Sequence, residues 1–550
     1  MPDHEERLGL VVGGSLVEGL RIRLDEAASV EDIRVGHFLR VAGEKHDFFC
    51  LVKDVRLDAT SDDVAADPPS PDEGFLRAVL LGTSAYGTLE AQPMLMLSRE
   101  NAGAEGEEAG PLPVKTVPSH FSPVFSADES DFTRVFGEEA ADRFLIGAPQ
   151  DMDAPVRLDL RRFVERSNGV FGKSGTGKSF LTRLLLCGVI KSNVATNLVF
   201  DMHSEYGWSS QSESGSMVKG LRQLFSSNQV ATYTLDWDSA RDRPVKPDGQ
   251  IRIGLNEIDI EDIALLQNEL RLNPTAVESA SLCEDRFKDR WIAELTDDDT
   301  NVKELADDIG ANSASLGALR NKLRAHITRL KFIQTHVSMK DSGLELLIAD
   351  LERGRHVVLE FGQHRTLIAY MLAANVITRR IYQRWTTRVE EHKQSGGKRP
   401  APTQLMITIE EAHRFLNPGV SEQTIFGTIA RELRKYNVTL LVVDQRPSGI
   451  DDEVLSQIGT RITCALNDDK DIEAVLAGVS GASQLRSILA RLDTRQEAMI
   501  MGHAVPMPMP IRTRSYDEAF YATLGPWGDD PVFVAEKSRE YDELFPPDES

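Results

Sequence analysis

The chain has 550 residues, of which 41% are hydrophobic and 27% charged, and its formal net charge is −24. One hydrophobic core cannot hold a chain of this length, so we expect several domains of ordinary globular composition. The net charge argues against a protein that coats nucleic acid over its whole surface. It still allows a local basic channel, because phosphate binding depends on where Lys and Arg lie.

Cysteine spacing and hydropathy indicate the compartment. Cys50, Cys187, Cys283 and Cys464 lie far apart without a C-x-x-C pair, so the sequence predicts neither a zinc site nor a disulfide framework. The first residues do not form a basic segment that leads into an apolar signal core. No apolar run approaches the about 20 residues that span a bilayer. We therefore expect a cytoplasmic protein with no membrane segment of its own.

Residues 1–120 are predicted to form a small β-barrel. Short apolar or alternating runs separated by glycine turns are typical of strands in such barrels. The expected strands are 8–12, 20–24, 37–41 and 47–52, with two more strand-like segments within 75–98. Two polar stretches, 61–73 and 101–113, interrupt this pattern and predict loops or disorder.

From about residue 155 strands alternate with helices, which predicts an α/β fold with a mostly parallel sheet. We assign 121–254 and 344–520 to two parts of this core and 255–343 to an inserted helical subdomain. The core strands are expected at 168–171, 197–201, 356–361, 404–410, 439–444 and 461–465. The insertion helices are expected at 258–272, 274–295, 303–309 and 314–333. The acidic stretch 521–550 is expected to form a C-terminal arm.

The run G-K-S-G-T-G-K-S at 172–179 has the spacing of a phosphate-binding P-loop. It follows an apolar strand and opens into an apolar helix, which is the setting that the motif requires. The glycines let backbone N–H groups point at phosphate oxygens. Lys178 would reach the β- and γ-phosphates, and the Ser179 hydroxyl would bind Mg²⁺. The predicted nucleotide-binding residues are Gly172, Lys173, Ser174, Gly175, Thr176, Gly177, Lys178, Ser179 and Phe180.

The apolar run 404–410 ends in two adjacent carboxylates, Glu410 and Glu411. This is the Walker B arrangement, in which one acid holds the Mg²⁺ shell and the next polarises the attacking water. We assign Glu410 to the metal and Glu411 to the catalytic base. The alternative is that both acids only cap the positive end of the following helix.

Two further strands end in polar side chains. Asp201, His203 and Glu205 follow the strand 197–201, and Gln445 follows the strand 439–444. Strand carboxyl ends border the ligand crevice of a parallel sheet, so these residues are expected near the phosphates. Whether the first three act in hydrolysis or in loop positioning is open. Gln445 is expected to sense the γ-phosphate and orient the water, unless it is a buried amide satisfied by backbone groups.

Arginines provide the last part of the predicted site. Arg431 and Arg434 lie in a cationic segment before the strand 439–444, and Arg166 lies at the start of the P-loop strand. A charged helix face is the ordinary interpretation of the first two. In a ring ATPase, however, such an arginine can reach the neighbour's γ-phosphate and neutralise charge in the transition state.

These motifs together resemble the HerA family of hexameric DNA-translocating ATPases, within the wider HerA–FtsK superfamily of P-loop NTPases. The matching segments, in chain order, are Arg166 with 172–179, D-x-H-x-E-Y at 201–206, E-E-A-H-R-F at 410–415, 431–436, Q-R-P at 445–447 and 456–461. The resemblance covers most of the chain, including the barrel and the insertion. Departures at Ser204, Leu433, Asp444 and Gln496 indicate a divergent member.

The resemblance implies a RecA-like core, a homohexamer with ATP and Mg²⁺ at each interface, and duplex DNA in a central channel. One subunit would supply Lys178, Ser179, Glu410, Glu411 and Gln445, and the next would supply Arg166 with Arg431 or Arg434. The basic clusters at 320–331 and 379–380 are candidate channel segments.

The implied function is that of a double-stranded-DNA translocase or helicase acting with a partner nuclease in DNA end processing or repair. The alternative is an ATP-binding ring scaffold that organises a nuclease or other effector in an antiviral defence complex. A conjugation- or secretion-type ATPase of the same superfamily is disfavoured, because those proteins carry a membrane segment and this chain begins with a barrel.

Overall fold

The computed structural model describes residues 7–61, 66, 69–70, 72–99, 110–211, 217–241, 246–338, 343–419, 421, 424–432, 435–479, 481–494 and 496–524. The chain divides into two compact units. The first comprises Met1–Asp159 and Thr460–Arg514, and the second comprises Leu160–Gly459 and Ser515–Ser550. The C-terminal arm expected at 521–550 lies, from residue 525 onward, outside the described residues.

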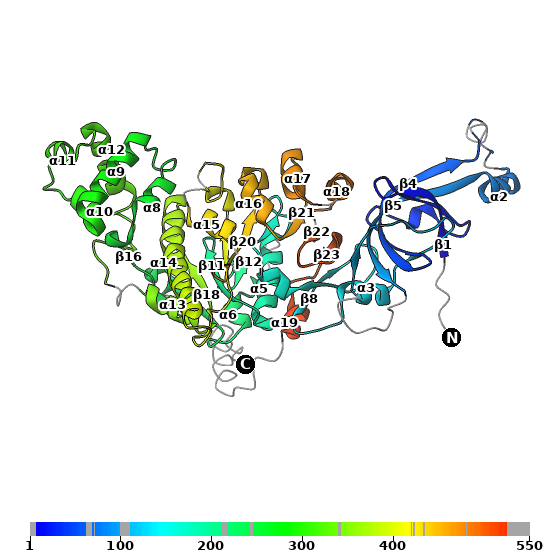
Figure 1. Cartoon of the computed structure of the whole chain (residues 1–550), viewed down its shortest axis with the longest axis horizontal. Coiled ribbons are helices and arrows are strands. Elements are labelled where there is room, and N and C mark those ends of the chain that lie inside the picture. The colour runs from blue at the N-terminus through cyan, green and yellow to red at the C-terminus, as the bar shows by residue number, and fades with distance from the viewer. Residues whose placement is uncertain are drawn as a thin grey trace, which may run out of the picture. The chain divides into compact units, whose positions relative to one another are not determined.

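The first unit begins with a closed antiparallel barrel (Figure 1). Its strands are β1 (Arg7–Ser15), β2 (Gly19–Leu24), β3 (Phe38–Ala42), β4 (His46–Ala59), β5 (Ala85–Ser98) and β7 (Pro123–Ser126). Pairing runs β1–β2–β5–β4–β3–β7 and returns to β1. In β2, Leu20, Ile22 and Leu24 are buried while Arg21 and Arg23 are exposed, which is the alternation expected of a half-buried strand. Closure gives each of these six strands a partner on both sides.

One expectation for the barrel is wrong. Residues 75–98 do not form two strands, but the helix α2 (Gly74–Thr83) followed by the single long strand β5. A short continuous apolar run such as 78–81 suits a helix as well as a buried strand, and periodicity cannot separate the two. The sixth barrel strand, β7, lies beyond residue 120, and 101–109 lie outside the described residues. The short strand β6 (Leu112–Pro113) pairs with β5.

The remainder of the first unit is an antiparallel arrangement of β8 (Arg143–Ala148), β9 (Val156–Asp159), β21 (Thr460–Cys464), β22 (Glu497–Gly502) and β23 (Met509–Thr513). Pairing runs β21–β22–β23–β8–β9. Its helices are α3 (Glu129–Phe136), α17 (Asp469–Leu476) and α18 (Ala482–Leu489). The strand expected at 461–465 therefore forms, and it pairs antiparallel with β22.

The second unit contains a parallel sheet in the order β15 (Gly249–Gln250), β14 (Val230–Thr234), β18 (His356–Glu360), β11 (Thr196–Asp201), β19 (Leu405–Glu410), β20 (Val438–Asp444) and β10 (Asn168–Phe171). Every adjacent pair is parallel. Residues of β10, β11, β18, β19 and β20 are buried throughout. Burial on both faces explains why these strands appear as continuous apolar runs. The predicted α/β, RecA-like class with an N-terminal barrel is confirmed.

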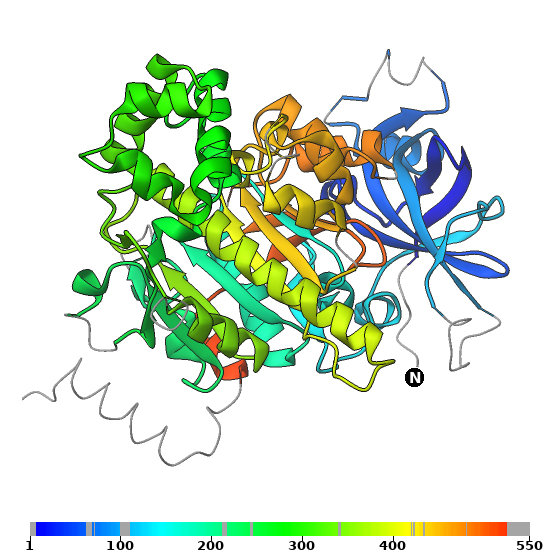
Figure 2. The same cartoon turned by 60° about the vertical axis from the view of Figure 1, so that its left-hand side comes forward.

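Helices accompany this sheet. They are α4 (Leu160–Val164), α5 (Lys178–Ser192), α6 (Leu221–Leu224), α7 (Trp237–Ala240), α13 (Leu344–Glu352), α14 (Leu367–Gln394), α15 (Ile425–Glu432), α16 (Asp452–Gln457) and α19 (Glu518–Thr523). Figure 2 shows the long helix α14 running across the sheet. Residues 181–190 of α5 are all buried, so this helix lies within the core.

Between β16 (Ile253–Gly254) and β17 (Ile333–Gln334), which pair with each other, the chain is helical. The helices are α8 (Ile260–Leu265), α9 (Pro274–Phe287), α10 (Trp291–Thr296), α11 (Val302–Ile309) and α12 (Ser313–His326). A short hairpin of β12 (Ser210–Gln211) and β13 (Met217–Val218) completes the unit. No helix in the described ranges is both long and apolar enough to cross a bilayer.

Arg379 anchors this helical region to α14. Its Nη2 lies 2.8 Å from Asp262 Oδ2 and donates to the Glu257 carbonyl at 2.8 Å, and it also contacts Asp259. Asn375 Nδ2 donates to Asp262 Oδ1 at 2.6 Å. Arg379 is therefore a buried structural cation, and its expected place in a DNA channel is wrong. In the other candidate segment, Arg320 donates to the Thr300 carbonyl at 3.1 Å, which also gives it a structural contact.

Candidate functional site: a nucleotide site at the strand ends

The P-loop joins β10 to α5, as the sequence predicts. Gly175 and Gly177 have φ of 77° and 90°, a region that residues with a Cβ adopt at a cost. No side chain caps the first turn of α5, whose N-cap is Gly177. The N–H groups at a helix N-terminus of this kind form an anion-binding surface. The loop thus presents backbone donors where phosphate oxygens are expected.

Lys178 stands at the first position of α5. Its Nζ donates to the Lys173 carbonyl at 2.8 Å, across the loop. Thr176 Oγ1 donates to the same carbonyl at 2.8 Å. The ammonium group therefore lies over the loop that is predicted to hold the phosphates. Ser179 is the next residue and lies in the first turn of the same helix.

Three strand ends meet the P-loop at one edge of the sheet. β10 pairs with β20 so that Phe171 lies opposite Asp444, and the Gly172 N–H donates to the Asp444 carbonyl at 3.2 Å. β19 pairs with β20 so that Glu410 lies opposite Val443. Since the strands are parallel, their carboxyl ends form one crevice. The structure thus brings together the P-loop, the acid pair and the end of β20.

Glu410 is buried at the end of β19. Its Oε1 accepts a hydrogen bond from the Tyr206 hydroxyl at 2.8 Å, while its Oε2 is buried without a partner among the described residues. The Tyr370 hydroxyl accepts from the Glu410 N–H at 3.0 Å. Burial, reinforced by the charge of Glu205, raises the pKa of Glu410 to about 8. A buried carboxylate with an unsatisfied oxygen fits a position that a cation stabilises.

The donor set around Glu410 fits Mg²⁺. In the described residues, no group of three or more His, Cys, Asp or Glu side chains forms a ready cage for a metal. Mg²⁺ is commonly bound through one or two protein oxygens, with waters and substrate phosphates completing its shell. The Ser179 hydroxyl and the Glu410 carboxylate are oxygen donors of this kind.

Glu411 turns sharply away from the strand. Its φ and ψ of 50° and 43° are left-handed, a strained conformation for a residue with a Cβ that is often found at functional sites. Its side chain is 33% exposed, and its Oε1 accepts a hydrogen bond from Gln445 Nε2 at 3.1 Å. The two adjacent carboxylates therefore occupy different environments, one buried and one reachable by water. This separation matches their two predicted roles.

His413 and Asp444 support this arrangement, and the sequence reasoning missed them as a pair. Asp444 Oδ2 accepts from the His413 N–H at 2.7 Å and lies 3.0 Å from His413 Nδ1. His413 Nδ1 also lies 3.6 Å from Glu411 Oε2. Asp444 therefore has a structural role where the family resemblance leads one to expect Ser. Tyr370, from α14, was also missed, because nothing near it in sequence marks it.

Asp201 holds a loop. Its Oδ1 accepts from the Glu205 N–H at 2.7 Å, and its Oδ2 accepts from the N–H groups of Tyr206 and Gly207 at 2.9 and 3.0 Å. The same loop includes Ser204, whose φ of 58° is left-handed and explains why Gly suits this position. The geometry of Asp201 favours loop positioning over chemistry. Its loop delivers Tyr206 to Glu410.

Phe180 lies in an aromatic cluster beside the P-loop. Its ring centroid lies 6.3 Å from that of Tyr516, and the Arg183 guanidinium lies 5.3 Å from the Phe180 centroid. The segment around α19 is fastened nearby, since Lys191 Nζ donates to the Thr523 carbonyl at 2.7 Å. Phe180 therefore packs beside the segment that contains Tyr516 and α19.

The candidate arginines do not complete the site within one chain. Arg166 lies before β10, at the end of the strand opposite the P-loop, and packs against Gly459, where a Cβ would lie 2.6 Å from the Arg166 Cβ. Arg431 donates to the Ser421 carbonyl at 3.2 Å and lies 3.3 Å from Glu453 Oε2. Arg434 lies outside the described residues. Within the described ranges, neither Arg166 nor Arg431 contacts the P-loop.

Comparison with known proteins gives consistent matches. Residues 144–381 match the family described as helicase HerA, central domain. The chain is 24% identical over 414 residues to the DNA double-strand break repair helicase HerA of Pyrococcus furiosus, covering 70% of this chain and 71% of that protein. It is 25% identical over 426 residues to the same-named protein of Sulfolobus acidocaldarius, covering 77% of both. The bacterial conjugative coupling protein TrwB superposes with a TM-score of 0.45 and 13% identity, over 70% of this chain and 91% of that one.

Proposed function

We propose that the chain is a HerA-type P-loop ATPase, and that it works as a homohexameric ring that uses ATP hydrolysis to translocate double-stranded DNA. We further propose that it acts with a partner nuclease in DNA end processing, in the cytoplasm. The names of its relatives as DNA double-strand break repair helicases support the DNA part of this proposal.

One observation supports the hydrolysis mechanism most directly. Glu410, Glu411 and Gln445 lie beside the P-loop, and Gln445 donates a hydrogen bond to Glu411 at 3.1 Å. Lys178 and the N–H groups of the loop would hold the β- and γ-phosphates. Ser179 and Glu410 would hold Mg²⁺, which neutralises phosphate charge when it is bound.

Glu411 would take the proton of the attacking water as general base. Its partial exposure gives water access to the carboxylate, and Gln445 fixes the carboxylate's direction through its amide. His413, held by Asp444, limits the rotation of Glu411 from the other side. Each of these side chains comes from the end of β19 or β20, so the rigid sheet sets their spacing.

The proposed ring follows from what one chain lacks. In the part of the chain that the structure describes, Lys178 lies at the P-loop but Arg166 and Arg431 do not. The charge that develops on a transferring phosphoryl group needs such further cations. Arg166 and either Arg431 or Arg434 of a neighbouring copy are the proposed donors. For Arg431 this requires release from Ser421 and Glu453.

The test is ATP hydrolysis by the purified protein with and without duplex DNA. We expect duplex DNA to bind and to raise the rate, and the Lys178→Ala variant to lose hydrolysis. Single-stranded DNA of the same length is the control. If duplex DNA does not bind and does not raise the hydrolysis rate, the translocase proposal is overturned.

The scaffold alternative makes a different prediction in cells. Replacing Glu411 by Gln blocks hydrolysis while sparing the groups that bind ATP. A motor then loses its biological activity, whereas a scaffold that only binds ATP retains the activity of its effector.

A further inference from the structure

Exposed apolar side chains are concentrated in the barrel. Of the twelve large hydrophobic side chains exposed in the described residues, nine lie before residue 127 and only three, Met217, Leu282 and Leu346, lie after it. Exposed apolar surface that gathers in one region of a protein marks an interaction site. The barrel is therefore the part of the chain where a macromolecular contact is expected.

The first concentration lies at the tip of a ribbon. β4 and β5 pair from His46 opposite Ser98 to Ala59 opposite Ala85, and α2 follows at the far end (Figure 1). The exposed side chains here are Leu57, Phe75, Leu76 and Val79, and Phe75 is 86% exposed. We call these four residues the apolar tip. Asp72 and Glu73, which are also exposed, precede the helix.

The second concentration lies at the opposite end of the same ribbon. An open groove of about 540 Å³ there is lined by aromatic residues, among them Phe121 and Phe125. Phe121 is 68% exposed and has a φ of 64°. Its backbone is held in place because its N–H donates to the Val11 carbonyl at 2.8 Å. A bulky residue held in a left-handed conformation, with its ring in solvent, indicates a function rather than a packing role.

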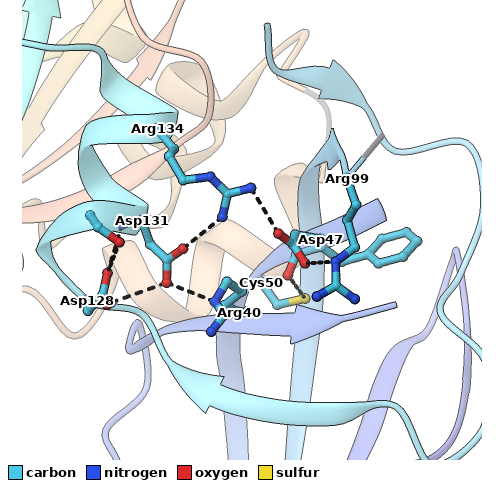
Figure 3. A network of polar contacts seen from close by, with 9 residues as sticks. Arg40, Asp47, Cys50, Arg99, Asp128, Asp131 and Arg134 are labelled. Carbon is cyan, nitrogen blue, oxygen red and sulfur yellow. Dashed lines mark hydrogen bonds and ion pairs between the residues drawn. The ribbon is translucent and has the colours of Figure 1, made fainter. Parts of the chain in front are cut away.

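Two arginines that line this groove belong to a network of ion pairs (Figure 3). Arg40 Nε lies 3.0 Å from Asp131 Oδ2, and Arg99 Nε lies 3.3 Å from Asp47 Oδ1. Arg134 joins the two acids, with its Nη2 at 2.9 Å from Asp47 and its Nη1 at 3.2 Å from Asp131. Since Arg40 and Arg99 both line the groove, its shape is preformed.

The positions of tip and groove exclude a contact within one chain. The ribbon between them is 14 residues long in each strand, which at about 3.3 Å per residue spans about 45 Å. A projecting apolar element and a complementary groove at opposite ends of one molecule generate head-to-tail assembly, which closes into a ring when the rotation allows it. Charge also favours this pairing, because the exposed Asp72 and Glu73 precede the tip and the half-exposed Arg99 lines the groove beside Glu44.

We propose that the apolar tip of one subunit docks into the aromatic groove of the next subunit's barrel. This contact is separate from the shared ATP site. Only the closing of these head-to-tail contacts into a ring rests on the proposed function. The occupant of the groove is a second copy of this chain.

The test is disulfide crosslinking between introduced cysteines, without ATP or DNA. All four native cysteines are buried, so surface crosslinks report only the introduced pair. A chain with Glu73→Cys mixed with a chain carrying His120→Cys is expected to give a crosslinked dimer on mild oxidation. A chain that carries both substitutions is expected to give a ladder of higher species. Neither single variant alone should crosslink through this pair.

The control replaces His120→Cys by Val17→Cys, an equally accessible site in the β1–β2 turn, whose neighbours Leu16 and Glu18 contact the middle of the ribbon. The inference is overturned if the tip pairs with residue 17 as readily as with residue 120, or if no crosslink forms. Failure of the crosslink because the tip binds a different protein overturns it as well. Adding Phe75→Ser and Leu76→Ser to the cysteine chains should abolish crosslinking.

This result is independent of the proposed function. The crosslink is expected to persist in a Lys178→Ala background, where hydrolysis is lost. A crosslink in a protein that duplex DNA does not stimulate would support the barrel contact and overturn the translocase. Duplex-stimulated hydrolysis without a crosslink would do the reverse.

Discussion

Gln445 Nε2 donates a hydrogen bond to Glu411 Oε1 at 3.1 Å, which joins the residues that follow two neighbouring strands of the parallel sheet. The hydrogen bond fixes one carboxylate oxygen of Glu411, which is the partly exposed member of the acid pair. It also ties the proposed base to β20, whose last residue lies beside the P-loop. Movement of that strand end and the position of the base are therefore linked.

The first prediction concerns the base itself. Glu411→Gln keeps the shape of the side chain and removes its ability to accept a proton. We expect the turnover number to fall by about 10²- to 10⁴-fold, the usual contribution of a general base, with nucleotide affinity nearly unchanged. Steady-state hydrolysis together with binding of a fluorescent nucleotide measures both. Equal losses in affinity and turnover would contradict the assignment.

The second prediction concerns the partner of that base. Gln445→Ala removes the 3.1 Å bond to Glu411, and we expect a smaller fall in turnover than for Glu411→Gln, with little change in KM. Because the two residues act together, the double variant should be little worse than Glu411→Gln alone. Gln394→Ala, at an exposed position at the end of α14, is the matched control. Additive losses in the double variant would show that Gln445 acts elsewhere.

The third prediction concerns the attachment of the helical insertion. Arg379→Met leaves Asp262, whose side chain is fully buried, without its 2.8 Å ionic partner. We expect the free energy of unfolding to fall by about 3–5 kcal/mol, the cost of an uncompensated buried charge. Arg286→Met is the control, because its 3.3 Å contact with Asp308 is exposed on both sides and should cost under about 1 kcal/mol. Adding Asp262→Asn to Arg379→Met should restore much of the loss.

The fourth prediction concerns pH. Burial lowers the pKa of His356 to about 4 from an ordinary value of 6.5, and its Nδ1 accepts a hydrogen bond from the Asn197 N–H at 3.1 Å. The unfolded chain therefore binds a proton that the folded chain refuses between about pH 6.5 and 4, so stability falls as pH falls through this window. The loss approaches about 3 kcal/mol. Denaturant unfolding of wild type and His356→Gln across this range measures it, and identical slopes would contradict the assignment.

The sequence predicts much of this fold because buried parallel strands are continuous apolar runs. Asn168–Phe171 forms as expected, and the acid pair and the P-loop meet because both follow strands of one sheet. The helix α2 could not be predicted, since its short apolar run fits a strand as well.

Contacts that depend on tertiary structure also escaped prediction. Tyr370 reaches Glu410 from 40 positions away in the chain, and Arg379 resembles a surface cation until α14 packs against Asp262. The pairing of His413 with Asp444 depends on the neighbouring positions of β19 and β20. In each case the local residue pattern carries no information about the partner.

The central claim is that neighbouring subunits share one ATP site, and mixing two inactive variants tests it most directly. Lys178→Ala removes the phosphate-binding amine but keeps Arg166, whereas Arg166→Ala keeps the amine and removes the proposed donor in trans. Each alone should hydrolyse ATP poorly. Mixed at equal concentration, they form interfaces that pair an intact P-loop with an intact arginine, so we predict a clear gain in hydrolysis over the sum of the two. A mixture no more active than its components, or full activity of a monomeric form, would contradict the shared site.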